Sequence, residues 1–162
     1  MAAILFTLFI SCSKKTDNTD INKAIIERYF IEVDKGENEA VVIIDELFDP
    51  DYVGHFAASE IKGITELKRH NSASYASFSK MEHIIKDNMA TGDKVITRVL
   101  FRAVHDKGEF AGIPPSGKQL SCPVIYIHEI RNGKIKEAWL DFDALFSLMQ
   151  QAGSVSSPGQ GN

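Results

Sequence analysis

The sequence predicts one α+β domain in which helices come first and an antiparallel sheet follows. A chain of 162 residues is long enough to bury one core of ordinary size. Apolar residues recur at helical spacing from residue 20 to residue 48, whereas strand-like runs dominate from residue 81 onwards. The last two runs flank Asn132-Gly133, the pair that favours a tight hairpin turn because both positions need positive φ. Helices followed by a meander indicate an α+β fold and not a parallel sheet.

The elements follow in order along the chain. The first expected helix lies within residues 20–37, with Asp20 as N-cap and Gly36 beyond its end. Asn38 caps a second helix that Pro50 ends. A third helix is expected over 63–78. Two strands flank Thr91-Gly92-Asp93, and two more flank Asn132-Gly133. The folded domain is expected to span residues 20–153, before a flexible tail at 154–162.

The first residues, "MAAILFTLFISCSKK", are expected to be a targeting signal and not part of the domain. The apolar run 2–10 is too short to span a bilayer and has the length of a secretory signal core. Residues 9–12 resemble a bacterial lipobox, in which a small residue precedes an acylated cysteine, here Cys12. No Lys or Arg precedes the run, and Phe9 stands where Leu is usual. We expect a signal at 1–12, a polar tether at 13–19 and lipid anchoring in the bacterial cell envelope; the alternative is a secreted or periplasmic protein with an incidental cysteine.

The composition narrows the possible partners. The chain is 44% hydrophobic and 25% charged, with a formal net charge of -4. This charge gives no electrostatic reason to expect a nucleic acid partner. A membrane is expected only through the lipid anchor. If Cys12 is acylated, Cys122 is the remaining cysteine, and we expect it to be a small buried residue.

Strand alternation in the last hairpin predicts two different faces. With Arg131 paired to Lys134 and no bulge, His128 lies opposite Glu137. One face then holds aromatic and acidic residues: Tyr126, His128, Glu137, Trp139, Asp141 and Asp143. The other face is continuously apolar: Ile125, Ile127, Ala138, Leu140 and Phe142. One face is expected to pack on the core or on a subunit and the other to border a cavity, and the alternation leaves open which is which. The apolar face motivates the expectation of a homodimer.

Several motifs together resemble one known family. They are "PDYVGH" at 50–55, "GDKVITR" at 92–98, "GEFAGIPPSGKQL" at 108–120, "RNGKIKEAW" at 131–139, and an Asp before "ALFSLMQQAG". The set, spanning 21–153, resembles the SnoaL-like polyketide cyclases, also called ester cyclases. The resemblance implies a nuclear-transport-factor-2-like cone, in which helices fold over a strongly curved sheet with a pocket between them.

The resemblance also implies a chemistry. An acidic pocket residue in such cyclases acts as general acid/base in an intramolecular aldol closure, with no metal or organic cofactor. That acid corresponds to Asp143, four residues after Trp139, and His55 matches the histidine closing the "DYVGH" segment. These two are the expected catalytic residues. The expected pocket candidates are His105, Tyr126, His128, Trp139, Asp141 and Phe110. His105 is one residue further from Gly-Glu-Phe than usual, and "FSK" at 78–80 replaces Phe-Pro-Asp, which weakens the transfer of a particular substrate.

Each candidate also has a structural interpretation. An aspartate at the start of "DALFSLMQQ" accepts hydrogen bonds from free backbone N–H groups, so Asp143 is a helix cap or an acid/base, and Asp141 belongs mainly to the helix start. His128 and Glu137 could form a cross-strand ion pair. His70 and His83 show no partner in the sequence and are expected at the surface or an edge. "GIPPSG" at 112–117 lacks the lysine-serine ending of a phosphate loop and is expected to be a rigid loop at the pocket rim.

Two functions therefore stand side by side. One is a cofactor-independent cyclase or isomerase acting on a small, fairly apolar carbonyl compound, with Asp143 as acid/base. The other is a lipid-anchored domain that binds a small ligand or a second subunit without chemistry.

Acylation of Cys12 is the first testable expectation. Cells grown with a radioactive fatty acid should label the wild-type protein and should not label Cys12→Ala, because the variant lacks the acylated thiol. Equal labelling of both proteins would contradict the lipid anchor.

Self-association is the second expectation. Sedimentation of the protein without residues 1–19 should give a dimer at micromolar concentration, because an apolar sheet face is otherwise left to solvent. A monomer throughout that range would contradict it.

Overall fold

The computed structural model confirms the α+β class. It describes residues 18–56, 59–140 and 142–153, with the backbone alone for 142–146. Its elements are α1 (Thr19–Val33), α2 (Glu37–Leu47), β1 (Phe48–Phe56), β2 (Ser59–Lys62), α3 (Gly63–Ser77), β3 (Ser79–Thr91), β4 (Lys94–Val104), β5 (Gln119–Arg131), β6 (Lys134–Leu140) and α4 (Phe142–Ala152). The expected signal with Cys12, most of the tether, Asp141 and the tail lie outside the described residues.

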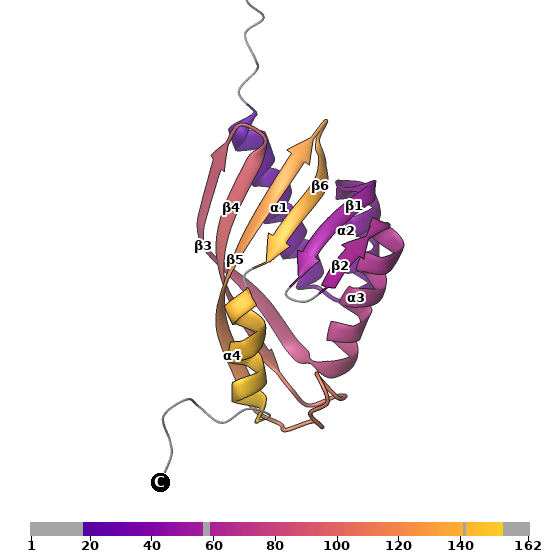
Figure 1. Ribbon diagram of the computed structural model, residues 1–162, viewed down its shortest axis with the longest axis vertical. Helices are drawn as coiled ribbons and strands as arrows, with labels where there is room; N and C mark the ends of the chain where they lie inside the picture. Colours follow the sequence, from indigo (N-terminus) through magenta and orange to yellow (C-terminus); the bar gives the residue numbers. More distant parts are fainter. Residues whose placement is uncertain (1–17, 57–58, 141, 154–162) are drawn as a thin grey trace, which may run out of the picture.

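The six strands form one curved sheet in the order β2-β1-β6-β5-β4-β3 (Figure 1). Both predicted hairpins are present, and Asn132 and Gly133 have the positive φ values of 53° and 74° that the tight turn requires. The segment around Pro50, expected only to break a helix, forms β1. Strand β1 runs parallel to β6, so one pair departs from the antiparallel pattern.

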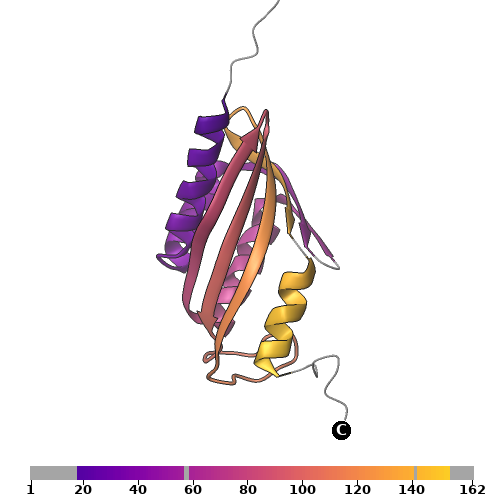
Figure 2. The same cartoon turned by 90° about the vertical axis from the view of Figure 1, so that its left-hand side faces the viewer.

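The N-terminal helices and α3 lie against one face of the sheet. Helix α1 packs on β3 and β4, whereas α2 and α3 pack on β1, and Figure 2 shows α1 lying alongside the strands. Two expected caps are each wrong by two residues. Asp20 lies in the first turn of α1, after the cap residue Asn18, and Asn38 lies inside α2, after the cap residue Gly36. Glycine fits the second cap because its φ is +146°.

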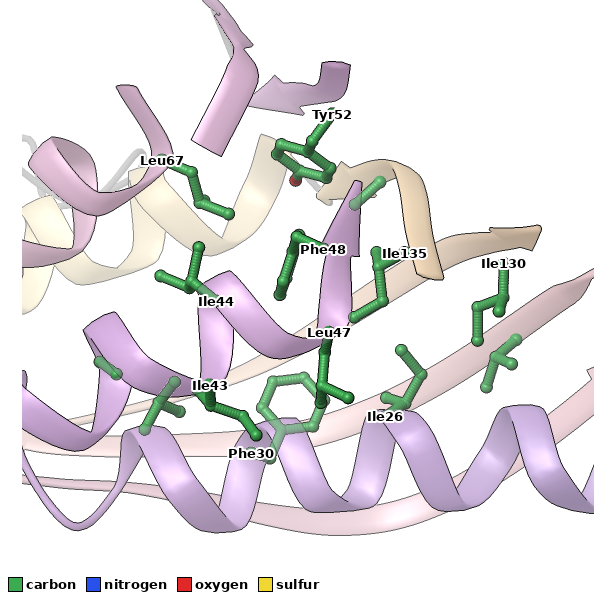
Figure 3. Close-up of a cluster of buried hydrophobic side chains, with 14 of the residues drawn as sticks. Ile26, Phe30, Ile43, Ile44, Leu47, Phe48, Tyr52, Leu67, Ile130 and Ile135 are labelled. Carbon is green, nitrogen blue, oxygen red and sulfur yellow. The ribbon is translucent and has the colours of Figure 1, made fainter. Parts of the chain in front are cut away.

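A core between the helices and the sheet holds these layers together. Figure 3 shows apolar side chains of α1 and α2 meeting those of β1, β5 and β6. Ile26, Ile44 and Ile135 are each 0% exposed. Full burial of one such side chain stabilises the fold by about 1.5–3 kcal/mol. Cys122 is buried as predicted, at 1% exposure.

The predicted register of the last hairpin is correct at the turn and wrong beyond it. Arg131 pairs with Lys134, but a β-bulge follows, so that His128 lies opposite Ala138 and Glu137 lies opposite Glu129. A single extra residue in one strand reverses which face all later side chains occupy. Glu137 and Trp139 therefore lie on the outer face, away from Tyr126 and His128. The predicted His128–Glu137 pair does not form, and the two predicted faces exchange their β6 residues.

None of the helices in the described part of the chain is both long and apolar enough to cross a membrane.

Candidate functional site

A cavity of about 240 Å³ lies between the inner face of the sheet and the helices. Its wall is mostly apolar and aromatic, with contributions from α1, α3, α4 and every strand except β2. Its polar wall residues are Tyr29, Tyr52, His70, Asn71, Ser74, Tyr75, His83, Tyr126 and His128. Among the described residues that line it there is no Lys, Arg, Asp or Glu. The cavity has the size and character of a site for a small, largely apolar molecule.

Four of the predicted pocket residues line this cavity: Phe110, Tyr126, His128 and Trp139. The rings of Tyr126 and His128 are stacked, with centroids 5.7 Å apart and an interplanar angle of 12°. Burial lowers the pKa of His128 from 6.5 to about 3, so this imidazole is neutral at physiological pH. Burial also raises the pKa of the Tyr126 hydroxyl, which stays protonated and can donate a hydrogen bond.

His55 is not among the residues that line the cavity. It lies on the outer face of the sheet in β1, where Nε2 is 2.7 Å from Glu137 Oε1 and Nδ1 is 3.4 Å from Glu60 Oε1. Its ring stacks on Trp139 at a centroid distance of 5.2 Å. Trp139 also borders the cavity, but its indole is held between His55 and the Lys94 ammonium, which lies 4.2 Å from the ring centroid.

His105 is buried away from the cavity wall and organises the loop that follows β4. Its Nε2 lies 2.9 Å from the Gly108 carbonyl oxygen, and its Nδ1 lies 3.3 Å from Ser116 Oγ. The His105 main chain also bonds to Ser116, Gly117 and Lys118. These bonds fix the loop that carries Phe110 to the cavity, so this histidine supports the site from behind.

Asp143 lies in the first turn of α4, which starts at Phe142. A carboxylate in the first turn of a helix is stabilised by the helix dipole. The side chain of Asp143 and the whole of Asp141 lie outside the described residues.

The structure also brings together a pair that the sequence analysis missed. His83, expected at the surface or an edge, lies in the edge strand β3 and lines the cavity, and its Nδ1 lies 2.6 Å from Oδ1 of Asp34 at the end of α1. The other Asp34 oxygen, Oδ2, accepts the His83 backbone N–H at 2.7 Å. The His83 ring packs between Phe30 and Phe101, at 5.2 and 5.0 Å between centroids.

This geometry sets the tautomer of His83. A carboxylate only accepts hydrogen bonds, so Nδ1 carries the proton and Nε2 keeps a lone pair. A buried carboxylate bonded to one imidazole nitrogen also stabilises the positive charge that forms when the other nitrogen takes up a proton. The Asp34–His83 pair has the arrangement of an oriented general base at a cavity wall.

Two further cavity groups can donate or accept hydrogen bonds. The Tyr29 hydroxyl is hydrogen-bonded to the Asn71 side chain, and burial raises its pKa to about 12. His70, also expected at the surface, packs on Phe56 at 4.9 Å and has its pKa lowered by burial. Among the described residues, no group of three or more His, Cys, Asp or Glu side chains is placed to hold a metal ion.

The alternation of residues in β3 could have placed His83 on the inner face of the sheet, but nothing in the local sequence indicated its partner Asp34. His83 alternates with Met81 and Ile85 in β3, which puts it on the inner face with them. Asp34 is 49 residues away in sequence and follows a helix, so no local pattern links the two.

Comparison with known proteins identifies relatives of the fold. The sequence model of the SnoaL-like polyketide cyclase family matches residues 25–152. No curated protein matches the chain.

Solved structures agree with this match. A Jannaschia sp. CCS1 protein named after the same family shares 20% identity at a TM-score of 0.77, covering 87% of this chain and 98% of its own. AclR of Streptomyces galilaeus, a proposed hydroxylase, shares 22% identity at a TM-score of 0.71, with coverage of 85% and 98%. IdmH of Streptomyces antibioticus, a proposed polyketide cyclase, shares 24% identity at a TM-score of 0.64, with coverage of 80% and 98%. These likenesses are evidence of the fold.

Burial of His128 predicts how the stability of the fold depends on pH. The unfolded chain protonates His128 near pH 6.5, whereas the folded chain keeps it neutral down to about pH 3. The neutral His128 side chain therefore contributes fully to the free energy of unfolding above pH 6.5, and this contribution is lost as the pH falls towards 3. We expect the free energy of unfolding to fall by up to about 1.4 kcal/mol per pH unit from this group. Urea unfolding should show a shallower decline for His128→Phe, and equal slopes for the two proteins would contradict the assignment.

Proposed function

The chain belongs to the SnoaL-like polyketide cyclase family, and from this premise we propose that it binds a small, mostly apolar carbonyl compound and moves a proton on it without a cofactor. The reaction class is removal of a proton next to a carbonyl group, as in an aldol closure or an isomerisation. The single observation that carries the proposal is the Asp34–His83 pair at the wall of an apolar cavity.

His83 is the proposed base. Its Nε2 lone pair would take the proton from the carbon next to the carbonyl, and the C–H electron pair would move onto the carbonyl oxygen as an enolate. The Asp34 carboxylate, 2.6 Å from Nδ1, would stabilise the resulting imidazolium. If the enolate is conjugated with a C=C bond, reprotonation from the same imidazolium at another carbon completes an isomerisation. In a ring closure the enolate carbon attacks a second carbonyl of the same molecule, and the imidazolium returns its proton to the new alkoxide oxygen.

The enolate oxygen needs a hydrogen-bond donor in the same cavity. Tyr29 and Tyr126 both line the cavity, and burial raises the pKa of both hydroxyls, so each keeps its proton at neutral pH. A hydroxyl in an apolar surrounding stabilises a developing negative charge more strongly than it does in water. Either tyrosine can fill this role.

Asp143 remains in the proposal as a second acid/base, on the strength of the family resemblance and its place at the start of α4. Catalysis by His55 gains no support from its position on the outer face of the sheet, beside Glu137 and Trp139.

Hydrogen exchange on a simple ketone tests the proposed base. In D₂O, the full-length protein should catalyse exchange of the hydrogens next to the carbonyl of 1-tetralone, a bicyclic neutral ketone, followed by NMR. We expect Asp34→Asn and His83→Asn each to lower the rate roughly 10²-fold or more, because a positioned general base contributes about that factor. Asp87→Asn is the matched control, since Asp87 lies on the same strand as His83, pairs with Arg98 of β4 and does not line the cavity.

The outcomes separate the candidate functions. Loss of exchange in the two pair variants with a normal Asp87→Asn protein supports His83 as base. A large loss in Asp143→Asn together with full exchange in His83→Asn would transfer the role to Asp143. Binding of 1-tetralone without any exchange would favour the non-enzymatic ligand-binding domain.

A further inference from the structure

His128 has a buried polar atom that the protein does not satisfy. Its side chain lines the cavity and the residue is only 2% exposed. Its Nδ1 is buried and has no hydrogen-bond partner among the described residues. Leaving such a group unpaired is unfavourable, so buried polar atoms of this kind mark places where a further partner is expected.

The surroundings of His128 limit where that partner can come from. Its neighbours across the sheet are Val95 in β4 and Ala138 in β6, both apolar. One side of the ring is stacked on Tyr126, and the edge of Phe30 packs against it at a centroid distance of 6.2 Å. Neither the sheet nor these rings offer a hydrogen bond to the imidazole. His128 lines the cavity, so the cavity is the side from which a ligand can reach the imidazole.

The charge of the wall limits what the partner can be. No Lys or Arg is among the described residues that line the cavity. His128 and His70 do not replace them, because burial lowers the pKa of both and leaves them neutral at physiological pH. An anionic ligand would thus be taken out of water without a cation beside it, which is strongly unfavourable. Asp34, behind His83, would add repulsion.

We infer that the cavity selects an uncharged ligand, which places a hydroxyl or carbonyl oxygen against the His128 imidazole, and that it rejects carboxylates and phosphates. This inference rests on the proposed function for the location of the ligand and adds its chemical class and its polar anchor. A neutral imidazole suits the task because it can donate to a carbonyl or accept from a hydroxyl according to its tautomer. The apolar remainder of the ligand would lie against the aromatic wall.

A ligand series with one shared bicyclic skeleton tests this inference by binding alone. Calorimetric titration of the full-length protein at neutral pH would compare naphthalene, 2-naphthol, 2-acetylnaphthalene and 2-naphthoate. We expect the two uncharged oxygen compounds to bind about ten-fold more tightly than naphthalene, the value of one hydrogen bond to a buried group. The ionised 2-naphthoate should bind at least about ten-fold more weakly than 2-naphthol, for want of a cation.

The variant His128→Phe keeps an aromatic ring and removes both nitrogens. In this variant 2-naphthol and 2-acetylnaphthalene should bind no more tightly than naphthalene. The affinity for naphthalene itself should be unchanged, which shows that the cavity is intact. His55→Phe is the matched control on the outer face and should behave as wild type. If His128→Phe does not fold, nitrogen NMR of histidine-labelled wild-type protein gives the answer: 2-naphthol, and not naphthalene, should shift the His128 ring signals.

The results that overturn the inference are specific. Equal affinities for 2-naphthoate and 2-naphthol would contradict the charge selection. If His128→Phe still bound 2-naphthol more tightly than naphthalene by the wild-type factor, the role of His128 as the polar anchor would be contradicted. Either result would leave the tetralone exchange assay unaffected, so the proposed acid/base function would stand. Failure of the whole series to bind would overturn both the charge selection and the anchor, and exchange on 1-tetralone would then show whether the proposed function survives.

Discussion

One extra residue in β6 controls the chemical character of the cavity. The bulge near Lys136 changes the pairing between β5 and β6, so that Ala138 and Leu140 face inward and Glu137 and Trp139 face outward. Without this offset, strand alternation would place Glu137 next to His128 on the inner face. The bulge sends the carboxylate to the outer face, where His55 binds it. Lys136 itself forms an ion pair with Asp49 of β1 at 2.8 Å. A local irregularity in the ladder keeps the Glu137 carboxylate out of the cavity.

The apolar wall that results determines how the remaining polar groups behave. Burial lowers the pKa of His128 and raises that of Tyr126, so both groups are neutral and can form hydrogen bonds without bringing charge into the cavity. Asp34 is absent from the residues that line the cavity, but its carboxylate is hydrogen-bonded to His83, which lines it. The proposed base His83 and the proposed anchor His128 can therefore share one small cavity. Asp34 lies beside His83 outside the cavity lining, and neutral His128 needs no counter-charge.

Helix α1 places the main parts of this arrangement. Phe30 packs against His83, Tyr126 and His128, and Asp34 follows one turn later, where its backbone N–H donates to the Phe30 carbonyl at 3.3 Å. Tyr75 of α3 donates its hydroxyl hydrogen bond to the Val33 carbonyl at 2.5 Å, which ties the end of α1 to the other side of the cavity. The position of Asp34 therefore depends on the same packing of α1 that forms the core, so the contacts that stabilise the fold also position the site.

The amino-acid sequence by itself determined the α+β class, the order of the helices, both β-hairpins and the family, because periodicity and turn chemistry act over a few residues and appear directly in the pattern. It also indicated Phe110, Tyr126, His128 and Trp139 as cavity residues. Tertiary structure alone decided the parallel pairing of β1 with β6, the outward position of His55 and the Asp34–His83 pair. A bulge adds one residue without a clear sequence signal, and a contact across 49 residues depends on how whole elements pack. The assignment of β6 residues to the inner and outer faces of the sheet therefore required the tertiary structure.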